Sequence, residues 1–452
     1  MPIKTTMFYA ALASLPLLAE PCFAAVDAAK IAELGQRLTP VGAEQAGNAA
    51  GTIPAWTGGL PKDAGKVVDG FREDPFAKEQ PLFTITAKNL DQYRAQLSPG
   101  QQALFARYPD TYKMPVYPSH RSIAWPQSTY ETILKNAAST QLVADGNGLT
   151  DYRSPLAFAI PQNGLEVVWN HITRYRGGSF ERETTALMTT PNGTYSWKTE
   201  RDRLAYSEQL LDYDPSKAGN VLYYFTSENI APARDVGSVL LVHETLDQVK
   251  EPRMAWQYNA GQRRVRRAPQ VAYDSPGPGN LRTTDQTDMF NGSPNRYDWQ
   301  LVGKKELYIP YNSFRLADPN VRYDDLVTPG HINQDKTRYE LHRVWEVIAT
   351  LKPGQRHVYS KRHLFIDEDS WTIVEADHYD NRGNLWRVSE NHVLPLYDVQ
   401  TQISAGELTY DLLSGRYLAN YVFNQTKNAY QFGLKAKSSD FTPAALRSMG
   451  IR

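Results

Sequence analysis

Four arginines within five residues form the strongest charge feature of this 452-residue chain. They are Arg263, Arg264, Arg266 and Arg267, and they flank Val265. On a β-strand, Arg263 and Arg267 lie on the same face as Val265, and Arg264 and Arg266 point to the other face. A guanidinium group binds carboxylates and phosphates through two parallel donors, so the run predicts a site for an anion or an acidic partner. The alternative is a set of sheet-surface arginines paired with neighbouring Asp and Glu.

A second candidate for chemistry is the acidic stretch Asp367-Glu368-Asp369. It lacks the glycine and the distal glutamate of an EF-hand loop, so it predicts a turn between strands rather than a calcium site. Among nine histidines, His357 and His363 share one face of a regular strand, which is a weak metal pattern. Neither has a closely spaced ligand partner, so we expect no metal and no cofactor.

The sequence contains no recognised catalytic motif. Gly-x-Ser-x-Gly, His-Glu-x-x-His, Cys-x-x-Cys and the two standard glycine-rich phosphate loops are all absent. The chain has one cysteine, Cys22. We therefore predict no catalytic residues and a protein that is not an enzyme. An exported hydrolase with an unidentified carboxylate or histidine site is the alternative.

The first residues predict export. Lys4 precedes an apolar stretch, Met7–Ala19, which is too short to span a bilayer. Cys22 and Ala24 are the small residues of a cleavage site, so we expect a signal peptide to be cut after Ala24. Glu20-Pro21 precede Cys22 where a lipoprotein signal has small or aliphatic residues, so lipidation is not expected. These features predict a soluble periplasmic protein without a thiol.

The composition argues against two classes of partner. The 49 basic and 49 acidic side chains cancel, so the net charge favours neither nucleic acid nor an anionic membrane surface. A hydrophobic content of 41% is enough to bury a core. Tyrosine outnumbers phenylalanine, 27 to 15, which is typical of large β-sheets and of ligand-groove walls.

Helices are expected in the first part of the chain. Leu90, Tyr93 and Leu97 recur at helical spacing, and Ser98-Pro99-Gly100-Gln101 has the residues of a helix start. The predicted helices all precede residue 175: 29–38, 87–97, 101–108, 130–138 and 164–172. Residues 39–61 are rich in Gly, Pro and Ala and predict an extended arm, with Trp56 docked on the body.

After residue 175 the apolar period changes to two, which predicts an antiparallel meander. Residues 255–267 form a hairpin in this interpretation, and Pro310 favours an edge strand. The other predicted strands are 221–226, 238–243, 305–314, 338–351, 357–366, 372–379 and 385–393.

These elements predict an α+β fold. We divide the chain into a signal peptide at 1–24, a helix and extended arm at 25–86, and one domain at 87–452. In that domain the helical part is about 87–175 and the β-sheet part about 176–452. We expect a hydrophobic cavity between the sheet and the helices before residue 175. Its candidate wall residues, for which core packing is the alternative, are Trp256, Tyr258, Tyr339, Leu341 and Trp345.

Several motifs resemble those of an exported bacterial family, domain of unknown function 1329. The longest is residues 38–59, LTPVGAEQAGNAAGTIPAWTGG. The other matching segments are 169–171, 255–259 with 261–267, 285–292, 339–345 and 367–371. The resemblance covers nearly the whole mature chain.

This family is similar to the LolA/LolB-like lipoprotein carriers. The resemblance implies a curved antiparallel β half-barrel with helices covering its concave face, plus the N-terminal arm. It further implies a periplasmic carrier or accessory protein that binds a lipid or other hydrophobic molecule. The partners it implies are an RND-type inner-membrane exporter and an outer-membrane β-protein. A structural component of an envelope complex, without a ligand, is a further alternative to the hydrolase.

Overall fold

The computed structural model describes residues 26–143, 145–217, 219–268 and 273–450. The predicted signal peptide and its cleavage point after Ala24 lie outside these residues. Within them, no helix is both long enough and apolar enough to cross a membrane.

The first long helix, α2, begins at the residues that the sequence predicted as a helix start, Ser98 to Gln101. Ser98 Oγ accepts from the Gln101 amide at 2.9 Å, and Gln101 Oε1 accepts from the Ser98 amide at 3.0 Å. The helices are α1 (Ala28–Ile31), α2 (Pro99–Arg107), α3 (Gln127–Ser139), α4 (Gly164–Thr173), α5 (Tyr323–Leu326) and α6 (Pro443–Met449).

Two predicted helices differ from the structure. The helix expected at 29–38 ends at Ile31, and residues 87–97 form two short 3₁₀ turns, Leu90–Gln92 and Arg94–Gln96. The Asn89 side chain accepts from the Thr86 amide at 2.7 Å and donates to the Thr84 carbonyl at 3.0 Å. This local bonding competes with a continuous helix.

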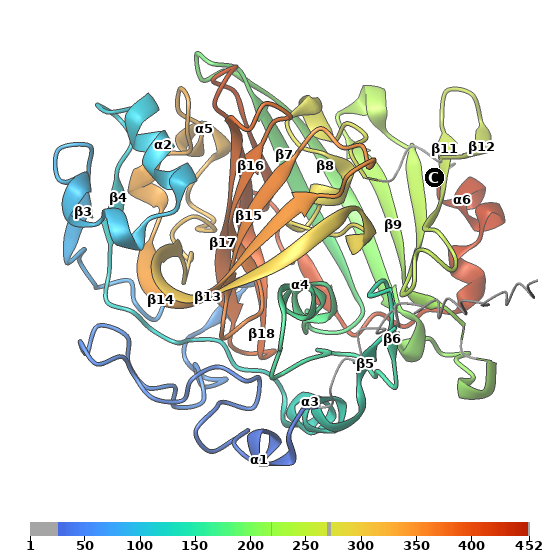
Figure 1. Ribbon diagram of the computed structural model, residues 1–452. Coiled ribbons are helices and arrows are strands. Elements are labelled where there is room, and N and C mark those ends of the chain that lie inside the picture. The colour runs from blue at the N-terminus through green and yellow to red at the C-terminus, as the bar shows by residue number, and fades with distance from the viewer. Residues whose placement is uncertain (1–25, 144, 218, 269–272, 451–452) are drawn as a thin grey trace, which may run out of the picture.

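Two β-meanders form one large open sheet (Figure 1). Strand β19 of the second meander pairs with β7 of the first, which joins them antiparallel. The first meander is β7 (Phe180–Thr189), β8 (Tyr195–Tyr206), β9 (Val221–Ala231), β10 (Val239–Thr245), β11 (Met254–Asn259) and β12 (Arg264–Arg267). The second is β14 (Tyr339–Leu351), β15 (Lys361–Asp367), β16 (Ile373–Tyr379), β17 (Leu385–Leu396), β18 (Thr401–Asp411) and β19 (Tyr417–Val422).

Further strands, one long and three short, complete the sheet at its margins. In the part of the chain that the structure describes, strand β13 (Tyr297–Pro310) pairs only with β14, so Pro310 ends an edge strand as predicted. Three short strands add to the sheet: β3 (Phe83–Ile85), β4 (Met114–Val116) and β20 (Tyr430–Phe432). Separate two-stranded pairs are β1 (Val67–Val68) with β2 (Phe71–Arg72), and β5 (Gln141–Leu142) with β6 (Leu149–Thr150).

The predicted fold class is confirmed. The chain is an α+β protein, and across the described residues its large open sheet is mostly antiparallel, with β4 parallel to β14, and does not close into a barrel. In Figure 1, α4 is seen between strands β13 and β14 on one side and the first meander on the other. Helices pack on both faces of β16: Glu375 and Asp377 face the start of α2, whereas Val374 and Ala376 belong to the core cluster of α4.

The N-terminal arm packs closely on the body. Trp56 Nε1 donates to the Ile123 carbonyl at 3.0 Å, which confirms the predicted docking. Gly42 has φ +90°, and a Cβ there would lie 1.7 Å from the Ala159 carbonyl oxygen. Only glycine allows this approach, which explains why the arm needs a glycine at this position.

Candidate functional site

The basic run lies on the β11–β12 hairpin at one end of the sheet. The predicted hairpin is confirmed, with Arg266 opposite Gln257 and Arg264 opposite Asn259. Arg263 lies in the turn before β12, with φ +52°, so its predicted place on the strand face of Val265 is wrong. Arg263, Arg264, Arg266 and Arg267 are all exposed. Among the described residues, none of the four forms an ion pair with a carboxylate. An exposed guanidinium cluster without carboxylate partners can bind an anion, and this role remains a prediction.

The five predicted wall residues occupy three different core clusters. Tyr339 and Leu341 pack in the cluster of α2, and Trp345 packs in the cluster of α4, where it stacks on Trp371. Trp256 and Tyr258 pack in a third cluster with α6. The alternation along β14 puts Tyr339 and Trp345 on one side of an ideal strand, but the sheet twists over this length. The five residues therefore do not form one wall.

The expected position of the cavity is also wrong. Val167 and Val168 of α4 pack directly into the core with strands β14 and β15. The cavities described beside α4 and α3 hold only about 20 and 30 Å³. Spaces of this size suit a water molecule rather than a ligand.

A much larger cavity, of about 650 Å³, lies beneath the N-terminal arm. Its floor is formed where β17 turns into β18, by Leu394, Leu396 and Ile403. Phe314 and Phe423 complete an aromatic side wall. The volume falls within the ~300–1,000 Å³ of small-molecule sites, and the apolar lining is typical of them.

The β1–β2 hairpin forms the outer wall of this cavity, and polar contacts hold it there. Arg72 makes a two-point ion pair with Asp398, at 2.8 and 2.9 Å. The Asn428 amide donates to the Asp69 carbonyl at 2.7 Å. Phe71 stacks on Phe423, with ring centroids 6.2 Å apart. The β1–β2 hairpin has no backbone pairing with the large sheet among the described residues, so these side-chain and loop contacts attach it to the body of the protein.

The rim of the cavity carries both signs of charge in equal number. Its lining includes four basic and four acidic residues. The basic residues are Lys66, Arg72, Arg315 and Lys427, and the acidic residues are Asp69, Glu73, Asp74 and Asp318. Arg315 donates to the Tyr117 hydroxyl at 2.6 Å and to the Glu79 carbonyl at 3.0 Å. Burial raises the pKa of the Asp74 carboxyl above its usual value. An apolar floor with a polar rim can hold the apolar part of an amphiphile and solvate its head.

The histidines singled out in the sequence bond to other groups within the fold. His171 Nδ1 accepts from the Ile373 amide at 3.0 Å, while its Nε2 lies 2.7 Å from the Asp288 carbonyl. Burial lowers the pKa of His171 to about 3, so it stays neutral. His357 and His363 do not meet: their Nε2 atoms contact Asp285 at 3.1 Å and Glu346 at 2.7 Å. His357 precedes β15, so the shared strand face expected for this pair is wrong.

A sequence model described as "Protein of unknown function (DUF1329)" matches residues 84–447. The chain belongs to this family. A relative along the whole length is the uncharacterized protein PA3922 of Pseudomonas aeruginosa. It is 57% identical over 455 residues, and the match covers 100% of both chains. The resemblance inferred from the sequence motifs is confirmed.

Solved structures similar to this DUF1329 chain include members of its own family and of the LolA superfamily. An outer membrane lipoprotein-sorting protein domain from Vibrio parahaemolyticus is 12% identical, with a TM-score of 0.44, covering 63% of this chain and 98% of its own. A DUF1329 protein from Desulfovibrio piger is 13% identical, with a TM-score of 0.42, covering 60% and 92%. The LolA superfamily protein NE2245 from Nitrosomonas europaea is 12% identical, with a TM-score of 0.38, covering 62% and 98%. At these TM-scores none of them assigns a ligand or an activity to the chain.

Proposed function

We propose that this protein is an exported carrier that shields one hydrophobic molecule in the cavity beneath β1–β2. The observation that supports the proposal most directly is the 650 Å³ cavity with its floor of Leu394, Leu396 and Ile403. Filling such a cavity with hydrocarbon removes apolar surface of both partners from water, at about 25 cal/mol per Å². No step of this function requires a catalytic residue, and the protein acts as a carrier rather than as an enzyme.

The polar rim restricts the chemistry of the ligand. Equal numbers of basic and acidic residues surround the opening, and several of them are already paired, as Arg72 is with Asp398 and Lys427 with Asp69. A strongly charged head would meet as many like charges as opposite charges at this rim. The proposed ligand is therefore a lipid or similar amphiphile with an apolar chain and a neutral or zwitterionic head.

Carriage between membranes requires partners for loading and delivery. The N-terminal sequence supports a periplasmic location, and the family resemblance supports an RND-type inner-membrane exporter and an outer-membrane β-protein as partners. The exposed arginines 264 and 266 form a surface that suits an acidic partner. We place docking on this hairpin, which leaves the cavity under β1–β2 free to exchange its ligand.

A cavity-filling substitution tests the proposal. Ile403→Trp puts a large side chain into the floor, and Leu413→Trp adds the same side chain at a position 69% exposed. We expect the Ile403 variant to lose binding of a fluorescent fatty-acid probe at least tenfold while Leu413→Trp binds as the wild type does. Equal binding by both folded variants would place the ligand elsewhere and would contradict the proposal.

A further inference from the structure

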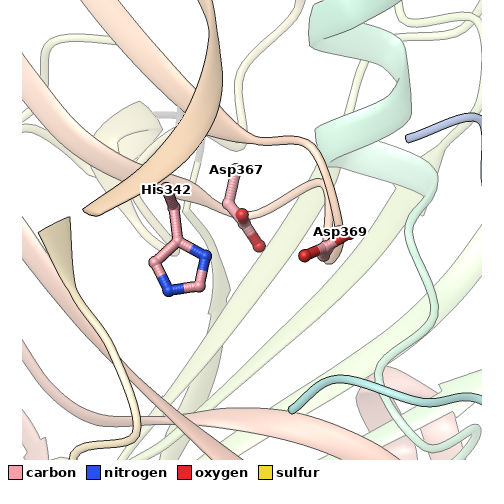
Figure 2. Close-up of side chains that lie close together, drawn as sticks. All are labelled: His342, Asp367 and Asp369. Carbon is pink, nitrogen blue, oxygen red and sulfur yellow. The ribbon is translucent and has the colours of Figure 1, made fainter. Parts of the chain in front are cut away.

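Three residues with metal-ligating side chains meet where β14 passes the end of β15. They are His342, Asp367 and Asp369, and Figure 2 shows the imidazole and both carboxylates turned toward a common space. One ligand atom from each lies within 4.8 Å of the others, and all three residues are buried. The group is independent of the cavity beneath β1–β2, since none of the three lines that cavity.

The register of the two strands produces this meeting. Val344 pairs with Asp367, so continuing the antiparallel register places His342 opposite Asp369. Residues two apart share a face of a strand, so Asp367 points to the same side as these two. Arg343 lies opposite Glu368 on the other face, where their side chains form an ion pair at 3.1 Å.

The imidazole is held as metal-bound histidines usually are. His342 Nε2 lies 3.1 Å from a Glu340 carboxylate oxygen, and Glu340 is fixed in turn by Arg338. A carboxylate at Nε2 holds the proton on that nitrogen, which leaves the lone pair of Nδ1 for a ligand. In Figure 2 the nitrogen nearer the backbone is the one that faces Asp367.

Asp367 is the incompletely satisfied member of the group. Its Oδ2 accepts from Ser370, at 3.0 Å from the amide and 2.6 Å from the hydroxyl. Its Oδ1 is buried without a hydrogen-bond partner. Among the described residues, no cation pairs with Asp367, whereas Arg121 pairs with Asp369 at 2.6 Å and Lys304 with Glu368 at 2.8 Å. A buried carboxylate oxygen without a partner is costly and indicates a missing donor or cation.

We infer that His342, Asp367 and Asp369 bind a divalent first-row transition-metal ion, with zinc as the best match for one imidazole and two carboxylates. Zinc bonds of about 2.0–2.2 Å hold two tetrahedral ligands of one ion roughly 3.5 Å apart. The ligand atoms of these three residues lie within 4.8 Å of one another, a separation that small side-chain rotations can close. Neutral imidazole and carboxylate ligands suit zinc. Arg121 then orients Asp369 from outside, since each carboxylate oxygen keeps a second lone pair for the ion. The ion fastens the turn after β15 to β14, a structural role separate from the ligand cavity.

Metal content tests this inference directly. The full mature protein is purified from cells grown with added zinc sulfate, desalted, and assayed by mass spectrometry for metals. We expect about one zinc per chain in the wild type and less than a tenth of that in His342→Ala and Asp367→Asn. His363→Ala is the matched control, because His363 also contacts a carboxylate, Glu346 at 2.7 Å, outside the group. It should keep its zinc.

A second readout covers the case in which the variants fail to fold. Cobalt bound in place of zinc in the wild type should give visible absorption of a site with nitrogen and oxygen ligands, and chelation of zinc should lower the melting temperature. A folded wild type without stoichiometric zinc would mean that a water or a proton fills the gap, which overturns the inference. Equal zinc in the wild type and in a folded His342→Ala would reveal an adventitious ion only, with the same consequence.

Discussion

Asp377 gives the sharpest test of the electrostatics of this fold. Its carboxyl is fully buried on β16, beneath the first turn of α2. The backbone of Gly100 in that turn packs so closely on it that an added Cβ would lie 2.0 Å from Asp377 Oδ1. Among the described residues, no cation forms an ion pair with it. Burial raises the pKa of Asp377 from 3.8 to about 7. We expect Asp377→Asn, which keeps the shape and removes the charge, to stabilise the protein at alkaline pH.

The magnitude follows from the pKa difference. A factor of ten in an equilibrium constant is worth about 1.4 kcal/mol, so a rise in pKa from 3.8 to about 7 corresponds to ~4 kcal/mol once the carboxyl is ionised in both states. The folded state binds the proton more tightly, so its stability is full below about pH 4 and falls until about pH 7. Asp377→Asn does not lose stability in this way. Its unfolding free energy should therefore equal that of the wild type at pH 4 and exceed it by about 4 kcal/mol at pH 8.

Urea unfolding at several pH values between 4 and 8 measures the effect as the difference in unfolding free energy between variant and wild type. Asp380→Asn is the matched control, since Asp380 is a partly buried residue directly after β16, and the hydrogen bonds that Asn384 donates to its carboxylate lower its pKa. It should show no gain at pH 8. A difference for Asp377→Asn that does not change with pH, or a wild type that is the more stable at pH 8, would refute the reasoning.

Three further variants test other parts of the structure. Arg72→Ala removes the ion pair that holds the β1–β2 hairpin and should speed release of a fluorescent fatty-acid probe in stopped-flow measurements; an unchanged rate would show that the hairpin does not control exchange. Arg264→Glu with Arg266→Glu should leave the melting temperature nearly unchanged and weaken partner binding, more at low salt than at high salt; unchanged binding would leave these arginines as surface residues. Gly42→Ala should cost about 3 kcal/mol or more of unfolding free energy, whereas Gly354→Ala, with similar φ but open space, should cost about 1 kcal/mol; equal losses would contradict the close packing of the arm.

Features set by neighbouring residues could be predicted from the sequence. The start of α2 depends on the neighbouring residues Ser98, Pro99 and Gln101, and the β11–β12 hairpin depends on the turn between its two strands. The edge position of β13 follows from the missing amide of Pro310. The helix expected at 87–97 was wrong because Asn89 bonds to nearby backbone, which apolar spacing does not reveal.

The candidate sites depend on contacts between distant segments and could not be predicted in this way. The cavity joins the arm near residue 70 to β17, β18 and the segment near residue 425, and no local pattern links these parts. Likewise, His342 meets Asp369 only through the β14–β15 register. Aromatic alternation selected Tyr339 and Trp345, but twist places these two side chains in different clusters. Sequence periodicity identifies buried faces without stating what covers them.

Native mass spectrometry of the protein purified from periplasm, with identification of bound lipids, tests the carrier function most directly. We predict that the wild type carries one amphiphile with a neutral or zwitterionic head, and that Ile403→Trp, which fills the floor of the cavity beneath β1–β2, carries none. Leu413→Trp should carry the same lipid as the wild type. A wild type purified without any bound lipid, or an Ile403→Trp variant that retains it in full, would contradict the account.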